Sequence, residues 1–133
     1  MARYTHTIDA KGRVFVPARL REEVGRTLVI TLNIDDGYLS GYTPERFADI
    51  RRQLEQLSGT DPAARRLRRA IIGEAMACEL DSQGRISVSM ELWSFIGVKP
   101  GDEICSKAFF DAQQAEQGSL SEVDLSGFDV RGL

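Results

Sequence analysis

The sequence of 133 residues lacks several features, and each absence excludes a class of protein. It has only two cysteines and one histidine, too few for a disulfide framework or for a zinc site with four ligands. Its apolar runs are only a few residues long, whereas a membrane helix needs about 20. No basic leader followed by an apolar core begins the chain. We therefore expect a cytoplasmic protein with no membrane partner, whose two thiols are reduced and at least half-buried.

Motifs for catalysis are also missing. The chain contains no nucleophile elbow, no glycine-rich phosphate loop, no cluster of metal ligands and no Ser/His/Asp set. His6 has no identifiable partner, and its strand position favours half-buried packing. We predict that the protein is not an enzyme and that it uses no metal, no cofactor and no small-molecule substrate.

The net charge of −3 conceals an uneven distribution. Residues 1–30 carry six basic and three acidic side chains, and residues 44–72 carry seven arginines and four acids. Residues 76–106 and 107–133 each carry two basic and five acidic side chains. Because a phosphate backbone responds to local potential, the first half of the chain remains compatible with nucleic acid.

The chain contains an internal repeat, in which residues 4–25 align with residues 76–97 at an offset of 72. The identical pairs are Asp9/Asp81, Gly12/Gly84, Arg13/Arg85, Val16/Val88, Leu20/Leu92 and Gly25/Gly97. This period is longer than that of solenoid repeats, which indicates a duplicated module.

Each copy predicts a β-hairpin followed by a short helix. In the first copy, residues 5–8 and 14–16 alternate as strands around a turn. Gly12 and Gly84 would hold the left-handed position of that turn. A short amphipathic helix would then end at Gly25 or Gly97, and Trp93 and Phe95 in it are expected in the core or an interface.

Strands over 27–32 and 38–42 complete the first copy, and two helices follow it. Thr43-Pro44 and Asp61-Pro62 are typical helix starts. The second helix carries Arg65, Arg66, Arg68 and Arg69. A solvated face, or ion pairs to a neighbouring subunit, is the commoner role of such a run, and DNA contact is the alternative.

The second copy is nine residues shorter than the first. Gly25 is followed by Phe47 after 22 positions, whereas the equivalent Gly97 is followed by Phe110 after 13. Its last strand is therefore either missing or supplied from elsewhere. A third helix is predicted over residues 106–117, and residues 118–133 are expected to be poorly ordered.

The paired motifs DAKGR (9–13) and DSQGR (81–85), joined through PAARRLRR (62–69), resemble the MraZ family of bacterial transcriptional regulators. The resemblance covers roughly residues 2–117. It implies an α+β, mainly β fold: a pseudo-twofold double-split β-barrel of two swapped-hairpin AbrB-like repeats with a helical linker. The first module would span 2–43, the linker 44–75, the shortened second module 76–105, the C-terminal helix 106–117 and the tail 118–133.

The resemblance places DNA contact on the first loop, at Lys11 and Arg13. Arginine is well shaped for bidentate contact with guanine, whereas the lysine would contact phosphate. Arg85 is the weaker candidate because its loop has Gln83 in place of the lysine. Arg3 completes the DNA-contact set, while the loop itself would be shaped by Asp9, Gly12, Asp81 and Gly84.

These observations predict a sequence-specific regulator in the cytoplasm and nucleoid. By resemblance, it would act as a ring-like homo-oligomer on direct repeats in double-stranded DNA upstream of division and cell-wall genes. The alternative is a non-enzymatic oligomeric protein-interaction module, antitoxin-like or a scaffold, with little affinity for DNA.

Overall fold

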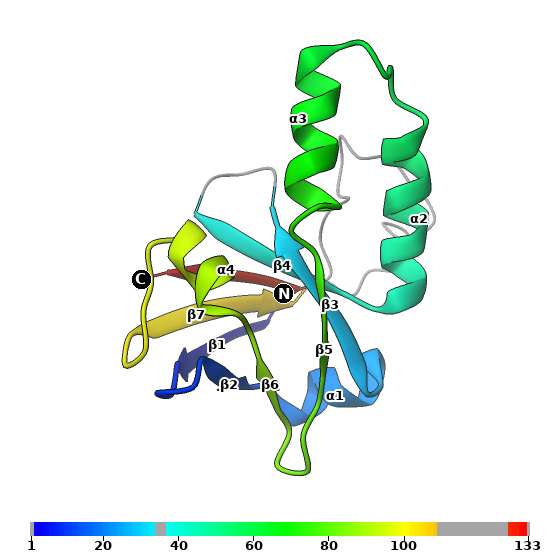
Figure 1. The fold of residues 1–133 in the computed structure, drawn as a ribbon. Helices are drawn as coiled ribbons and strands as arrows, with labels where there is room; N and C mark the ends of the chain where they lie inside the picture. The colour runs from blue at the N-terminus through cyan, green and yellow to red at the C-terminus, as the bar shows by residue number, and fades with distance from the viewer. Residues whose placement is uncertain (1, 34–36, 109–127, 133) are drawn as a thin grey trace.

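The computed structural model describes residues 2–33, 37–108 and 128–132 and has a mixed α/β fold with antiparallel sheets (Figure 1). In chain order the elements are β1 (Ala2–Thr7), β2 (Arg13–Phe15), α1 (Ala18–Val24), β3 (Thr27–Leu32), β4 (Tyr38–Tyr42), α2 (Pro44–Glu55), α3 (Pro62–Ile71), β5 (Met76–Glu79), β6 (Arg85–Ser87), α4 (Met90–Phe95), β7 (Glu103–Ala108) and β8 (Phe128–Gly132). The strands predicted over 27–32 and 38–42 are confirmed, as are both helices of the linker.

The described strands form two sheets in which every pair is antiparallel. The larger sheet has six strands in the order β1-β7-β8-β4-β3-β5, and β2 and β6 form a separate two-stranded ribbon. Both edge strands of the larger sheet, β1 and β5, lead directly into this ribbon.

Strands of the two copies pair with each other across the repeat. β3 of the first copy pairs with β5 of the second, with Leu28 opposite Cys78, and β1 pairs with β7 in the corresponding way. In the ribbon, Val14 lies opposite Ile86, its own equivalent at the repeat offset. Equivalent residues face each other where a two-fold axis passes between the two copies.

The predicted hairpin in each copy is therefore wrong in its pairing, although its turn is formed. The backbone N–H of Gly12 donates to the Asp9 carbonyl at 3.0 Å, and the N–H of Gly84 donates to the Asp81 carbonyl at the same distance. The flanking strands then diverge to different sheets. Alternating apolar residues fix which face of a strand is buried but do not specify the partner strand.

The C-terminal segment supplies the strand that the second copy lacks. β8 lies beside β7 as β4 lies beside β3, and β8 also pairs with β4. Two expectations are corrected by this arrangement. Residues 106–108, predicted to begin a helix, belong to β7, and residues 128–132, predicted to be poorly ordered, form β8. Residues 109–127 and 133 of those predictions lie outside the described residues.

The main hydrophobic core lies where the larger sheet, the ribbon, α1 and α4 meet. Its buried side chains include the repeat pairs Val14/Ile86, Val16/Val88 and Leu20/Leu92. Trp93 is only 1% exposed in this core, whereas Phe95 is 51% exposed and does not belong to it.

A second core joins α2 and α3 to the β3–β4 region, and its buried members are Tyr42, Phe47, Ile50, Leu54 and Ile71. Both helices begin as the sequence predicts. The Thr43 side chain accepts from the N–H of Arg46 at 3.2 Å, and the Asp61 side chain accepts from the N–H of Ala63 at 3.0 Å. The helix pair projects from the sheet, away from the turn between β5 and β6 (Figure 1).

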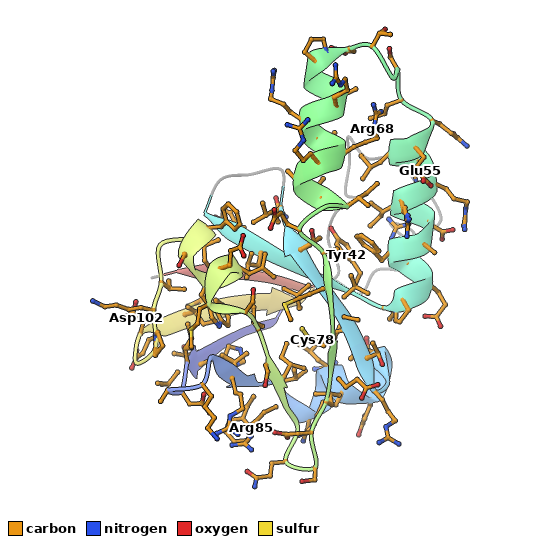
Figure 2. The ribbon with its side chains drawn as sticks, viewed as in Figure 1. Tyr42, Glu55, Arg68, Cys78, Arg85 and Asp102 are labelled. Carbon is orange, nitrogen blue, oxygen red and sulfur yellow. The ribbon has the colours of Figure 1, made fainter. Side chains whose placement is uncertain are left out.

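Arg68 joins the two linker helices. Its guanidinium donates to the carbonyls of Leu54, Leu57 and Ser58 at 3.3, 3.1 and 3.1 Å, and Figure 2 shows the side chain between α3 and α2. These carbonyls lie at the C-terminal end of α2, which a cation stabilises. Arg68 is therefore half-buried, whereas Arg65, Arg66 and Arg69 are exposed.

Candidate functional site

The turn between β1 and β2 forms a cage around the Asp9 carboxylate. One carboxylate oxygen accepts from the backbone N–H groups of Lys11 and Arg13, each at 2.9 Å. The other oxygen accepts from Nε of Arg13 at 2.7 Å. Because Nε is used, Asp9 fixes the direction of the Arg13 side chain. No described residue contacts the two terminal nitrogens of Arg13 through a polar bond.

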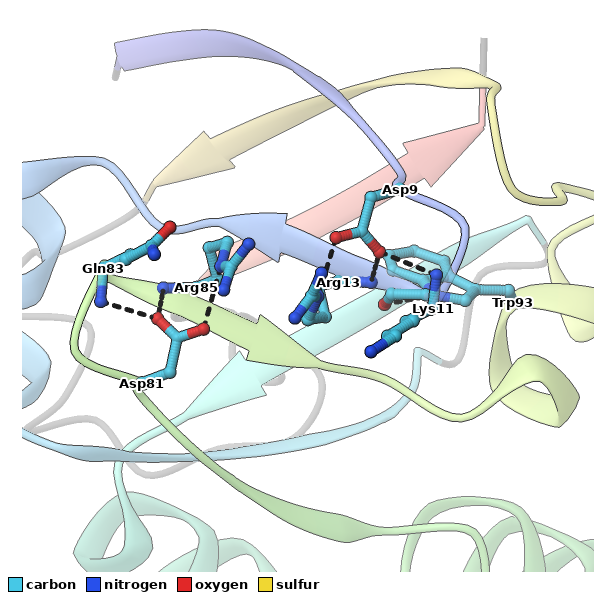
Figure 3. A network of polar contacts seen from close by, with 8 residues as sticks. Asp9, Lys11, Arg13, Asp81, Gln83, Arg85 and Trp93 are labelled. Atoms are coloured by element: carbon cyan, nitrogen blue, oxygen red, sulfur yellow. Dashed lines mark hydrogen bonds and ion pairs between the residues drawn. The ribbon is translucent and has the colours of Figure 1, made fainter.

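The second loop repeats this geometry. Asp81 accepts from the N–H groups of Gln83 and Arg85 at 2.9 Å, and from Nε of Arg85 at 2.8 Å. Figure 3 shows the two carboxylates at opposite ends of the β2–β6 ribbon, with both arginine side chains between them. Each aspartate therefore accepts three hydrogen bonds from within its own loop.

The hydrogen bonds shift the acidity of both carboxyl groups. The N–H of Arg13 is the main cause that lowers the pKa of Asp9 to about 2, and the arginine side chain and the N–H of Lys11 act in the same direction. The pKa of Asp81 is lowered in the same way, first by the N–H of Arg85. Both carboxyl groups are therefore ionised at neutral pH.

The β2–β6 ribbon has one buried face and one outer face. Val14 and Ile86 point inward and are 3% and 1% exposed. The alternate positions, Arg13, Phe15, Arg85 and Ser87, share the outer face. Arg13 lies opposite Ser87, whereas Arg85 lies opposite Phe15.

Phe15 makes the two arginine environments unequal. Its side chain is 54% exposed, and the Arg85 guanidinium lies 5.8 Å from the centre of its ring, within the range of a cation–π contact. The side chain of Arg85 is 19% exposed and that of Arg13 is 28% exposed. Arg13 is therefore the more accessible of the two.

Each loop is also held by residues from the other copy. The N–H of Val88 donates to the Gly12 carbonyl at 3.2 Å, and the N–H of Val16 donates to the Gly84 carbonyl at 2.9 Å. The buried indole of Trp93 adds a hydrogen bond from Nε1 to the Gly12 carbonyl at 3.0 Å (Figure 3). The sequence did not predict this role for Trp93.

Comparisons with known proteins identify relatives of this chain. The model of the family described as "MraZ protein, putative antitoxin-like" matches residues 1–70. A protein named transcriptional regulator MraZ from Ligilactobacillus salivarius (strain UCC118) is 44% identical over 143 aligned positions, which cover 98% of this chain and 99% of the relative. Its namesake from Thermoanaerobacter sp. (strain X514) is 39% identical over 120 positions, covering 84% of this chain and 83% of that protein. The chain belongs to the MraZ family.

The names of these MraZ relatives place the chain among transcriptional regulators, which are not a class of enzyme. A solved structure, that of PHS018 from Pyrococcus horikoshii, covers 78% of this MraZ chain and 84% of its own at 15% identity. Its TM-score is 0.36, which is too low to support any argument about fold or function.

The structure of this MraZ chain brings some of the predicted site residues together. Lys11 and Arg13 share one loop, Arg85 lies on the other, and all three belong to the surface around the ribbon. Arg3 lies on β1, where its backbone is paired with Lys107. It is therefore on the larger sheet and not on either loop.

The histidine and the two cysteines, the other reactive side chains, do not belong to either loop. His6 is half-buried in β1, and burial is the main cause that lowers its pKa. Both thiols are free; Cys78 is buried, which raises its pKa to about 11, and Cys105 is half-buried. Within the described ranges, no three His, Cys, Asp or Glu side chains gather into a metal-binding group. None of the described helices has the length and hydrophobicity to span a membrane.

Proposed function

We propose that this chain is a sequence-specific DNA-binding regulator that uses the outer face of the β2–β6 ribbon as its DNA-contacting surface. The observation that carries the proposal is the pair of aspartate-caged arginines on that face. In each cage the carboxylate uses Nε and leaves the terminal nitrogens of the guanidinium available. Those nitrogens form the fork that matches guanine O6 and N7. An arginine that is oriented in advance also loses less entropy on binding.

In this proposal, Arg13 contacts bases, Lys11 contacts phosphate, and Arg85 makes a second contact from the other loop. Asp9 and Asp81 orient the arginines and do not touch DNA, because a carboxylate is repelled by phosphate. Exchange of strands between the copies supports a double-split barrel of two swapped-hairpin modules, 2–43 and 76–105, with a linker over 44–75.

The proposal includes an oligomer. One chain offers few base contacts, each worth about 1–3 kcal/mol. Several copies in a ring would make later contacts intramolecular and raise the avidity by roughly 10²–10⁴. Such a ring would favour direct repeats, which by family resemblance lie upstream of division and cell-wall genes. The site of action would be the cytoplasm and nucleoid.

The test is Arg13→Ala, measured by gel-shift titration and light scattering. Loss of one good bidentate contact per chain predicts at least a tenfold weaker specific complex, with the oligomer unchanged. Arg65→Ala, on the exposed face of α3, is the matched control because it removes the same charge far from the ribbon. Wild-type affinity in the Arg13 variant would refute the assignment.

The alternative, a protein-interaction module with little DNA affinity, is favoured by one observation. The large apolar side chains of Phe15, Met90 and Phe95 are 54%, 43% and 51% exposed, and a protein partner would bury them. Salt titration separates the two hypotheses. Phosphate contacts make log K fall with log salt at a slope of about 0.9 per contact, whereas the alternative predicts weak duplex binding with no such dependence.

A further inference from the structure

Arg21 lies on α1 of the first copy, but its side chain reaches the loop of the second copy. Its Nη1 makes a long hydrogen bond of 3.5 Å to the Gln83 carbonyl. The guanidinium also occupies the space beside Gly84, where any Cβ would overlap it. Gly84 is followed directly by Arg85, so the fold places two arginines at one loop although they are 64 positions apart in the sequence.

The contacts of Arg21 leave its charge uncompensated. Among the described residues, the only side-chain polar contact of Arg21 is with the neutral Gln83 carbonyl, and no carboxylate forms an ion pair with it. The carboxylate of this loop, that of Asp81, already accepts three hydrogen bonds from the loop itself. The loop therefore has two cations beside it, of which only Arg85 is paired with a carboxylate, and an anion from outside the chain would complete the site.

The same balance holds at the first loop. There Asp9 forms an ion pair with Arg13, whereas Lys11 contacts Asp9 only through its backbone N–H, so the Lys11 ammonium makes no ion pair with a described residue. In the sequence, the second loop is the weaker candidate for DNA contact because Gln83 replaces the lysine. In the fold, Arg21 of α1 adds a basic side chain beside that loop. Each loop thus has two basic side chains and one caged carboxylate.

We propose that Arg21 and Arg85 together form a binding site for a backbone phosphate of duplex DNA. This inference rests on the proposed function and adds a contact residue outside both loop motifs. A guanidinium presents a planar pair of donors that matches two phosphate oxygens. Arg85 is held by Asp81 on one side and by the Phe15 ring on the other, while Arg21 is held by a single long hydrogen bond to the Gln83 carbonyl.

The experiment uses the full chain and a labelled duplex that the wild-type protein selects from random-sequence DNA. Binding is measured by fluorescence anisotropy over a series of NaCl concentrations. Arg21→Ala should weaken binding to all duplexes to a similar extent and reduce the slope of log K against log salt by about 0.9 for each bound chain. Arg21→Lys should retain most of the slope.

Arg19→Ala is the matched control, because this exposed residue lies on the same helix and its loss changes the net charge equally. It should leave the slope close to that of the wild type. Circular dichroism establishes that each variant is folded, and Arg21→Gln replaces the alanine variant if that one unfolds.

Two outcomes would overturn the inference while leaving the proposed function intact. A wild-type slope in the Arg21 variant, even with reduced affinity, would mean that the residue only positions the loop. An equal fall in slope for Arg19→Ala would mean that general charge is responsible. If the wild type itself bound no duplex, or if Arg13→Ala bound as the wild type does, the proposed function would fail independently.

Discussion

Replacing Gly12 by alanine should destabilise the protein more than the same change at Gly97, although both glycines have nearly the same backbone conformation. Their φ angles are +80° and +74°. A side chain in this region costs about 1–2 kcal/mol, partly offset by about 0.4–1 kcal/mol because alanine restricts the unfolded chain. At Gly97, where a Cβ would meet nothing within 4 Å, the net cost is therefore about 1 kcal/mol.

At Gly12 a Cβ would lie 2.7 Å from the Val88 carbonyl oxygen and 3.4 Å from Nε1 of Trp93. Neither neighbour can turn away freely, because Val88 is hydrogen-bonded to Gly12 and the indole is buried. Overpacking of this kind adds about 1–3 kcal/mol, for a total of about 2–4 kcal/mol. Gly84→Ala, whose Cβ meets the movable end of Arg21, should fall near the Gly97 value.

Urea denaturation provides the assay, at one protein concentration because an oligomer makes the midpoint concentration-dependent. With a slope of about 2 kcal/mol per molar urea, Gly12→Ala should lower the midpoint by roughly 1–2 M and Gly97→Ala by roughly 0.5 M. Circular dichroism follows global unfolding, and the single tryptophan, Trp93, reports locally. Free energies of unfolding that agree within about 0.5 kcal/mol between the two variants would refute the steric argument.

Two further predictions concern ionic contacts. Asp9→Asn should destabilise the protein at neutral pH, and the stability difference from the wild type should shrink between about pH 4 and pH 2. The pKa of Asp9 is about 2 in the folded protein, against an ordinary value of 3.8. The ionised carboxylate therefore stabilises the fold above the ordinary pKa, and this stabilisation is lost as the pH falls through the folded pKa. Urea midpoints across that range are the measurement, and a constant difference would contradict the prediction. Arg68→Ala should lower the free energy of unfolding by about 1–2 kcal/mol because it removes the guanidinium from three carbonyls. The control, Arg65→Ala at an exposed position, should change it by less than about 0.5 kcal/mol in thermal unfolding. Equal effects of the two substitutions would contradict the role of Arg68 in joining α2 to α3.

Local features of this fold were predictable because their causes lie within a few residues. The caps at Thr43 and Asp61 need only the N–H groups two or three positions later. The same holds for the turns closed by Gly12 and Gly84, whose carboxylate contacts all fall within four residues. Such contacts form wherever the chain is placed in the fold, so sequence patterns report them reliably.

Pairing between distant segments was not predictable in the same way. β2 pairs with β6 across the whole linker, and a three-residue alternating segment carries no information about its partner. β8 lies in a stretch whose glycines and serines indicate poor order, yet its backbone completes the sheet between β7 and β4. These strands are stabilised by hydrogen bonds to strands that are remote in the sequence.

One long-range feature had a signal that the repeat itself provides. At the offset of 72, Arg21 aligns with Trp93, and the two side chains do corresponding work: Trp93 reaches the first loop from the second copy, and Arg21 reaches the second loop from the first. A repeat whose strands are exchanged places each short helix against the opposite loop. Once the exchange of strands is known, the alignment of Arg21 with Trp93 predicts that both side chains contact the opposite loop.

This exchange also gives the two loops different contacts from the opposite copy. Their carboxylate cages agree within 0.1 Å in each side-chain hydrogen bond, so the difference lies in the anchors. The first loop is fixed by a rigid indole that is 1% exposed, and it carries its own cation, Lys11. The second loop is contacted by a flexible, half-buried arginine. Groove width varies with DNA sequence. In the proposed function, the loop held by Trp93 would contact bases through Arg13, and the loop beside Arg21 would adapt its phosphate contact to the shape of the duplex.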